Sequence, residues 1–378
     1  MPPLLPVLLL LALAVPAARA AWSAPDWSLG AEERLLSDDN LLKLSPADLA
    51  RLEDDPAFQT DADGHGGLRL EHRLSGDLRW RLKRKTGPFA ALQRAVGGKA
   101  GQGRLSLAWD GKWAQVAGMA GQGNTSQRLA LGWQPRAGWG AECSWRFLDN
   151  YDLRQFQDRD TGRERGATFD SDLYQLQLKA RAADLGPWCR QPGLALTLAR
   201  STEFYNAWFT EYDATARSLG LGLSWRMQAG LSAGLGWQFT ETDNTGFTGS
   251  LPGGTVSLGA DSESGDASQQ EDQYSLDLGW GGKLAGRGAG LDGSLSLRDR
   301  RYQSDLGELL DPFHYGRHDR RWQGSLRGRL DLIPAWSLLP FYEREWRQSE
   351  AAWSGIARTK NYALNRVGLG LRWKFGSD

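Results

Sequence analysis

Two of the four histidines in this chain lie near other residues that could take part in hydrolysis. His314 and His318 follow Ser304 and Asp311, and Asp319 is adjacent, so a hydroxyl, a base and a carboxylate occur within sixteen residues. The spacing matches no diagnostic Ser-His arrangement, and histidines in long loops are ordinarily solvated. We therefore expect no catalytic residues, and alanine at His314 and His318 would test that expectation.

Metal and cofactor sites are not expected either. Residues 60–64 begin like a calcium-binding loop, but the downstream glutamate and the other ligands are missing. Glycine pairs such as Gly220 and Gly222 are not followed by a helix, so they form no phosphate loop. We expect no metal, no cofactor and no nucleic-acid partner.

The chain has two cysteines, Cys143 and Cys189. Both fall towards the same end of neighbouring predicted strands, and disulfides persist in oxidising compartments of the cell envelope. A disulfide bridge between them is one hypothesis. The alternative is a lipid-facing Cys143 and a free Cys189.

Charged residues that alternate with apolar ones are the remaining candidates for chemistry. Alternation along a strand separates two faces, and the polar face of a membrane barrel lines its lumen. The predicted lumen is mainly basic and would favour anions. Its basic residues are Arg79, Arg81, Lys83, Arg104, Arg128, Lys179, Arg181, Arg226, Arg298, Arg327, Arg329, Arg372 and Lys374, and its acidic residues are Asp277, Asp292, Asp331, Glu343 and Glu345.

The alternation itself predicts the fold. In residues 366–375 every second residue is Val, Leu, Leu, Trp or Phe, and the residues between them are Arg, Gly, Gly, Arg and Lys. Similar segments recur along most of the chain, mean hydropathy is −0.50, and no segment approaches eighteen consecutive apolar residues. The sequence therefore predicts an all-β fold, a transmembrane antiparallel β-barrel of the bacterial outer membrane.

Fourteen strands are expected, with sixteen as the alternative, because such barrels have an even number. The count from the pattern is fifteen, so one segment is miscounted. The segments are 67–74, 77–85, 103–109, 112–120, 126–134, 139–149, 168–182, 193–205, 214–227, 229–241, 271–281, 290–301, 317–332, 336–347 and 362–375.

Loop lengths predict the orientation, since these barrels have short periplasmic turns and long outer loops. Short connections are predicted at 110–111, 135, 228–229 and 333–335, and long ones at 151–167, 243–270, 303–316 and 348–361. Aromatic residues gather beside the short connections and predict a girdle at the periplasmic interface. A soluble sandwich with core tryptophans is the alternative. The predicted girdle comprises Trp109, Trp133, Trp139, Trp225, Trp280, Trp336, Trp373 and Phe375.

The N-terminal region divides into two segments. Residues 1–21 have the apolar run and small-residue cleavage pattern of a signal peptide. Residues 22–65 form a short acidic segment, with eleven carboxylates in 22–64 against three basic residues, and are expected to be either a mobile periplasmic tail or a plug in the basic lumen. The barrel is expected to span residues 66–378.

The C-terminal third resembles a known family. Residues 315–321 (YGRHDRR), 339–344 (LPFYER) and 361–375 resemble the closing strands of the barrel in surface lipoprotein assembly modifiers. The resemblance implies a fourteen-stranded barrel, a helical-repeat periplasmic domain and a role in moving lipoproteins to the cell surface. No 34-residue helical repeat precedes Gly66. The terminal aromatic strand implies recognition by the barrel insertion machinery.

Three classes of function follow from these observations. The first is transport or translocation across or to the outer membrane surface, in the manner of a translocator, with an unidentified substrate or client. The second is a passive or plugged anion-preferring pore. The third is a surface-exposed interaction protein that uses the loop at 244–270. In each case we expect the outer membrane of a Gram-negative bacterium, contact with its lipid, and no enzymatic activity.

Overall fold

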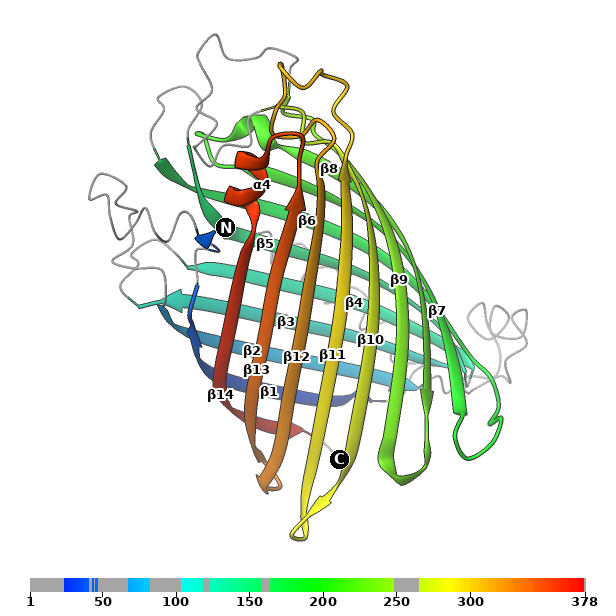
Figure 1. The fold of residues 1–378 in the computed structure, drawn as a ribbon. Helices are drawn as coiled ribbons and strands as arrows, with labels where there is room; N and C mark the ends of the chain where they lie inside the picture. The colour runs from blue at the N-terminus through cyan, green and yellow to red at the C-terminus, as the bar shows by residue number, and fades with distance from the viewer. Residues whose placement is uncertain are drawn as a thin grey trace.

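The computed structural model describes residues 24–40, 43, 45–46, 67–81, 103–117, 123–136, 138–157, 164–247 and 265–376. In these residues fourteen antiparallel strands close into one barrel, with β1 beside β14 (Figure 1). The predicted fold class and the count of fourteen are confirmed. The strands are β1 (Asp26–Asp38), β2 (Gly67–Arg81), β3 (Arg104–Val116), β4 (Asn124–Arg136), β5 (Trp139–Gln157), β6 (Glu164–Arg181), β7 (Arg190–Tyr205), β8 (Ala214–Arg226), β9 (Leu231–Asp243), β10 (Gln269–Leu284), β11 (Arg287–Tyr302), β12 (His318–Ile333), β13 (Trp336–Glu350) and β14 (Tyr362–Gly376).

The exterior of the barrel is apolar because the alternation holds along most strands. On β8, Leu219, Leu221 and Leu223 are 39 to 52% exposed, whereas Gly220 between them is buried. On β14, Val367, Leu369 and Leu371 are likewise exposed. A closed sheet leaves no unpaired edge, and an apolar outer wall suits lipid.

The barrel begins at Asp26, not at residue 66 as the alternation pattern predicts. Strand β1 pairs with β14 over Ser28–Asp38 and with β2 along its whole length. The acidic residues of this part of the chain are therefore wall residues, and Glu32 and Asp38 pair with arginines on β14. Residues 1–23, which include the predicted signal peptide, and 47–66 lie outside the described residues.

Two predicted hairpins are single strands. Residues 67–81 form β2, and residues 104–116 form β3 without a turn at Asp110 and Gly111. Gly111 is required for packing, because a Cβ there would lie 2.7 Å from Trp109 Cζ2 and 3.3 Å from Trp113 Cη2. Merging these two hairpins and adding β1 converts the fifteen predicted segments to fourteen strands.

One end of the barrel, here called the turn end, carries short connections. Connections of two to four residues join β4 to β5, β8 to β9, β10 to β11 and β12 to β13. At Ala229 and Gly230, and again at Ala285 and Gly286, two successive residues have φ between 49° and 78°, as in the type I′ turns that fit twisted hairpins. The first residue of β1 and the last residue of β14 lie at the same end.

Aromatic residues surround the turn end. The structure places Trp133, Trp139, Trp225, Trp280, Trp336, Trp373 and Phe375 within a few residues of strand ends there. Trp27 on β1 joins them, with its ring centroid 5.4 Å from that of Phe375. Trp109 is a correction: it lies in the middle of β3, opposite Gly76 and Leu129, because no turn follows it.

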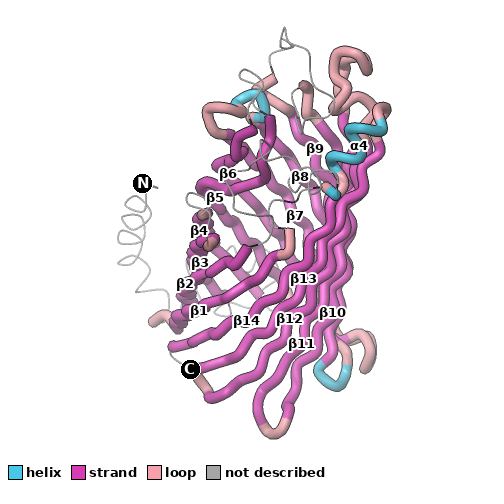
Figure 2. The backbone as a smooth tube through the Cα atoms, turned by 60° about the vertical axis from the view of Figure 1, so that its left-hand side comes forward, coloured by secondary structure: helices cyan, strands magenta, loops and turns pink. Residues whose placement is uncertain are grey.

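The opposite end, here called the loop end, carries most of the long connections and the short helices η2 (Thr210–Tyr212) and α4 (Ser354–Lys360) (Figures 1 and 2). The exception is the connection 82–103, which joins β2 to β3 at the turn end. Phe209, Phe313 and Ile356 in these connections are fully buried. No helix of the described segments is long and apolar enough to cross a membrane. The helix η3 (Gln228–Gly230) belongs to the turn end.

Candidate functional site

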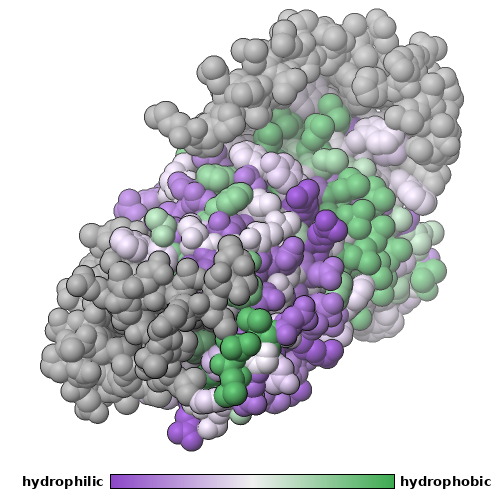
Figure 3. Space-filling view, turned by 90° about the horizontal axis from the view of Figure 1, so that it is seen from above, coloured by the Kyte–Doolittle hydropathy of each residue, from purple (hydrophilic) through white to green (hydrophobic). Residues whose placement is uncertain are grey.

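The lumen holds most of the charged residues of the barrel. Figure 3, seen from above in the orientation of Figure 1, shows hydrophilic side chains in the middle of the view and hydrophobic ones on its flank. Twelve of the thirteen basic residues predicted to line the lumen are described by the structure. Strand alternation places them on the inner face, opposite the exposed leucines of the same strands. The acidic positions Asp277, Asp292, Asp331, Glu343 and Glu345 share that inner face. The predicted residue Lys83 lies outside the described residues.

Four cavities follow one another along the inner wall and share arginines. A cavity of about 500 Å³ is lined by nine basic and five acidic side chains, and we call it the central cavity. It shares Arg34 and Arg73 with a cavity of about 420 Å³, which shares Arg327 with one of about 600 Å³. The last shares Arg181 with a cavity of about 760 Å³ at the turn end, which Arg81 and Arg104 also line. Arginines therefore line a path from the central cavity to the turn end.

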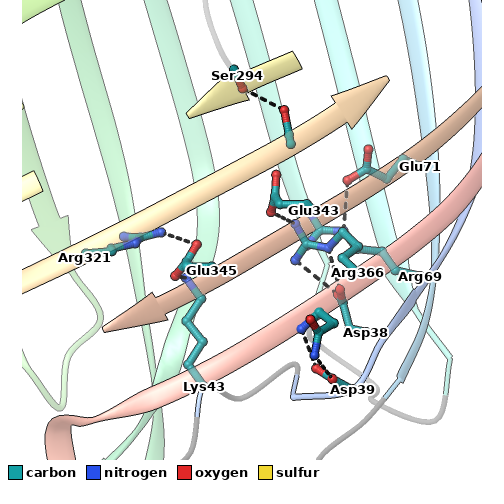
Figure 4. Close-up of polar contacts among 12 residues, drawn as sticks. Asp38, Asp39, Lys43, Arg69, Glu71, Ser294, Arg321, Glu343, Glu345 and Arg366 are labelled. Carbon is teal, nitrogen blue, oxygen red and sulfur yellow. Dashed lines mark hydrogen bonds and ion pairs between the residues drawn. The ribbon is translucent and has the colours of Figure 1, made fainter. Parts of the chain in front are cut away.

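Ion pairs in the lumen connect the first and last strands. Arg366 on β14 donates from Nε to Asp38 Oδ1 on β1 at 2.5 Å and from Nη1 to Glu343 Oε1 on β13 at 3.0 Å (Figure 4). Further down, Arg372 donates to Glu32 Oε2 at 2.7 Å. Glu32, Asp38 and Glu343 are buried. Because each pair joins adjacent strands, the pairs reinforce the closure of the barrel.

Glu345 marks the upper part of the central cavity. Its carboxylate accepts hydrogen bonds from Arg321 Nη2 at 2.6 Å and from the Tyr362 hydroxyl at 2.5 Å. Lys43, from the connection after β1, places its ammonium 3.6 Å from the same carboxylate (Figure 4). The described part of that connection therefore contacts the barrel wall, and Asn40 adds a hydrogen bond from its side-chain amide to the Ala363 carbonyl at 2.9 Å.

The opposite side of the central cavity has a cation, Arg146, that forms no ion pair with a carboxylate of the described residues. Arg128 on β4 and Lys179 on β6 both reach Glu142, at 2.5 and 3.4 Å. Arg146 on β5 is the direct cross-strand neighbour of Arg128 and lines the same cavity. Within the described ranges Arg146 has no hydrogen bond or ion pair, so its charge is available to a solute.

The predicted lumen set omitted several residues of this site. Arg69, Glu71 and Arg73 on β2, and Lys112 on β3, line the central cavity. Glu71 lies between Arg69 at 3.1 Å and Lys112 at 2.8 Å. The period-two alternation does identify them, because these β2 residues lie on the same odd-numbered face as Arg79 and Arg81. It was missed because β2 and β3 were each divided by a supposed turn.

The histidines near the loop end do not form a hydrolytic arrangement. Asp311 accepts hydrogen bonds from the Ser304 hydroxyl at 2.7 Å and from His314 Nδ1 at 2.9 Å, so the hydroxyl contacts the carboxylate and not the imidazole. His314 and Asp311 are fully buried. His318 lies on β12 and bonds Asp299 at 2.6 Å. This geometry positions the 303–317 connection.

Acid is expected to loosen the 303–317 connection through Asp311. Burial alone would raise the pKa of this carboxyl, but the hydrogen bonds and charge of His314 and the Ser304 hydroxyl hold the pKa below its ordinary value of 3.8. A lowered pKa means that the ionised group stabilises the folded connection above pH 3.8, and that this contribution disappears as the pH falls below it. Pepsin cleavage within 303–317 should therefore rise steeply below pH 3.8, and Asp311→Asn should cleave readily at every pH tested. Equal cleavage of both proteins across this range would contradict the assignment.

The two cysteines are free, which corrects the disulfide hypothesis. Cys143 is exposed on the outer face of β5 and pairs with Leu176 of β6, whereas Cys189 lies in the connection beyond Arg181, the end of β6. The five residues from Leu176 to Arg181 alone span about 17 Å at the rise of a strand. A disulfide needs Cα atoms within about 7 Å.

Comparisons with known proteins find similar architecture at low sequence identity. No protein-family model and no curated protein matches the chain. Among solved structures, an anion-selective porin from Comamonas acidovorans is 11% identical, with a TM-score of 0.44 over 94% of this chain and 100% of that one. A bacterial polysaccharide outer membrane secretin is 9% identical, with a TM-score of 0.42 over 91% and 98%. OmpT of Vibrio cholerae is 8% identical, with a TM-score of 0.41 over 93% and 98%.

With TM-scores below 0.5 these matches carry no argument, and none of them bears on the resemblance to surface lipoprotein assembly modifiers. The architecture rests on the chain itself: a closed sheet of antiparallel strands, an apolar outer wall, an aromatic girdle and a charged lumen. The chain is an outer-membrane β-barrel of fourteen strands.

Proposed function

We propose that this barrel is an anion-preferring channel of the Gram-negative outer membrane, with its turn end in the periplasm. The observation that carries the proposal is the series of linked cavities with an excess of arginine, from the central cavity to the turn end. Fixed positive charge on a narrow, low-dielectric wall raises the local concentration of anions and excludes cations. Arg146, which has no carboxylate partner within the described ranges, adds to that field.

The lumen is not a uniformly positive tube. Carboxylates such as Glu32, Glu71 and Glu345 neutralise part of the cluster and fix the arginines in place. An anion would therefore meet positioned guanidinium groups, which offer several donors each to carboxylate or phosphate oxygens. The proposal favours small anionic solutes over one particular molecule.

Single-channel recording of the purified full-length protein tests the proposal. In planar bilayers under a tenfold KCl gradient, the reversal potential is expected to have the sign of a chloride-preferring pore. The preference should weaken as ionic strength rises, because the Debye length falls from about 10 Å at 0.1 M to about 3 Å at 1 M. A cation-selective reversal potential, or bilayers that stay silent with demonstrably folded protein, would contradict it.

A translocator-like role remains the second candidate, supported by the resemblance of residues 315–375. A barrel that releases a lipid-anchored client sideways needs an opening in its wall. In this chain β1 and β14 are paired over eleven residues, and Arg366 and Arg372 bridge that seam. The sealed seam favours passage along the lumen, so the channel function is better supported than the translocator-like function. A surface-interaction role through 244–270 has no support of its own, since most of that loop lies outside the described residues.

A further inference from the structure

A glutamate and a histidine form a pair on the lipid-facing wall of the barrel. Glu33 on β1 and His72 on β2 are direct cross-strand partners, and the Glu33 carboxylate contacts His72 Nδ1. Their side chains are 57% and 36% exposed. Exposed leucines flank both positions along the strands, with Leu35 beyond Glu33 and with Leu70 and Leu74 on either side of His72. The pair therefore lies within the apolar belt.

The opposite wall has no equivalent in the described residues. On β7, β8 and β9 the outward positions at mid-strand are leucines, including Leu198, Leu221 and Leu235. Ionisable residues that face outward there, such as Arg200 and Arg217, lie nearer the loop end of their strands. The polar pair thus distinguishes one side of the barrel from the other.

Another polar group on the same wall lacks a partner. Trp109 on β3 faces outward beside β2, and its buried Nε1 donor has no hydrogen-bond acceptor in the described part of the chain. Ionised and polar groups in hydrocarbon are unfavourable, and they are usually covered by protein. Glu33 and His72 are exposed polar groups of this wall, which is therefore poorly suited to lipid alone.

We propose that the wall formed by β1, β2 and β3 is the contact between two copies of this chain, related by a two-fold axis along the membrane normal. Glu33 and His72 lie side by side in register (Figure 2 shows the two strands adjacent). Rotating a second copy by 180° about that axis brings its His72 opposite Glu33 of the first, and its Glu33 opposite His72. The pair is thus complementary to itself, which is the requirement of a two-fold interface.

The side-by-side arrangement of Glu33 and His72 favours a second copy of this chain as the partner of the wall. A second copy lies in the same membrane at the same depth and in the same orientation, so its acid and base meet their counterparts without any adjustment in height. The two Glu–His pairs become a cluster of two carboxylates and two imidazoles in alternation, shielded from lipid on both sides. The proposal is independent of whether the lumen conducts anions.

Three variants test the proposal through the mass of the purified protein in nanodiscs or mild detergent. Wild-type protein is expected to be a dimer. Glu33→Leu combined with His72→Leu removes the cluster but keeps an apolar wall, and should weaken dimerisation at least tenfold. Glu33→His alone places imidazoles opposite one another and should weaken it similarly. Glu33→His combined with His72→Glu exchanges the two charges, preserves the complementarity, and should restore the dimer.

Folding of each variant is checked by its heat-modifiable migration on gels, so loss of the dimer is separable from loss of the barrel. Cross-linking in native membranes is the second measurement, in a background with Cys143→Ser and Cys189→Ser. A short bismaleimide should join copies that carry Leu70→Cys on β2, and should not join copies that carry Leu221→Cys on β8. A monomeric wild type, a dimer unaffected by the double leucine variant, or cross-linking only to another membrane component would overturn the proposal.

Discussion

Changing Arg73, Arg181 and Arg327 together to glutamate is expected to convert the channel from anion to cation preference. One of these arginines lies at each junction between successive cavities, so a permeating ion passes each of them. A unit charge about 8 Å from an ion contributes roughly 1 kcal/mol at an effective dielectric constant of about 40. Three reversals change the local charge by six units, which exceeds the roughly 1.4 kcal/mol needed for a tenfold change in permeability ratio.

The measurement is the reversal potential under a KCl gradient, which should change sign. The same three positions changed to glutamine should reduce the chloride preference without inverting it. The matched control is Arg200, Arg217 and Arg320 changed to glutamate, since these arginines are exposed on outward positions of β7, β8 and β12 and carry the same total charge. If the control triple shifts selectivity as much as the lumen triple does, the path through the shared arginines is wrong.

Removing the Asp319 carboxylate is expected to release the 303–317 connection. Asp319 is 3% exposed and accepts from Arg317 Nε and Nη2 at 3.1 and 3.0 Å and from Arg347 Nη2 at 2.5 Å. Arg317 is itself fully buried and stacks on Tyr302, with 4.4 Å from its Cζ to the ring centroid. Asp319→Ala removes this carboxylate from the buried Arg317 guanidinium and the half-buried Arg347 guanidinium, a change that typically costs about 3–5 kcal/mol.

Hydrogen exchange of the 303–317 amides should therefore accelerate by two to three orders of magnitude, at roughly 1.4 kcal/mol per factor of ten. The control is Asp299→Ala on β11, which removes a partly exposed carboxylate from His318 at 2.6 Å and Arg301 at 3.6 Å. An exposed ion pair contributes up to about 1 kcal/mol, so exchange should change by less than tenfold. Equal exchange rates in the two variants would show that the buried network does not anchor the connection.

The sequence predicted the wall of the barrel better than its first three strands. From β4 onward the pattern predicts every strand, with most boundaries within about four residues, because lumen and lipid faces alternate along most of their length. The exception is the predicted loop at 151–167: β5 continues to Gln157 and β6 begins at Glu164, with register shifts at Leu148/Tyr151 and Asp152/Arg154 that break the alternation. β1 was missed because Glu33 occupies an outward position and Leu36 an inward one, so the alternation fails in the middle of the strand. Asp110 and Gly111 were taken as a turn because the dipeptide is typical of hairpins, yet Gly111 accommodates two indole rings.

The sequence predicts only part of the candidate site. Period-two alternation identified which arginines face inward, but not which of them are neutralised. Arg366 and Arg372 pair with Asp38 and Glu32, more than 320 residues away in the chain, and no local pattern records such partners. The disulfide hypothesis failed for a related reason, because proximity of strands does not give the height of each cysteine along them.

The seam between β1 and β14 also governs how the barrel can be made. The partners Glu32 and Arg372 are 340 residues apart, so β1 can pair with β14 only after almost the entire chain has been exported. Such non-local closure is slow, and until it occurs β1 and β13 each present a row of unpaired backbone groups to any other chain. A premature stop before Tyr362 would make that intermediate permanent. Truncated chains are therefore expected to aggregate during export, because the barrel cannot close without the fifteen residues of β14.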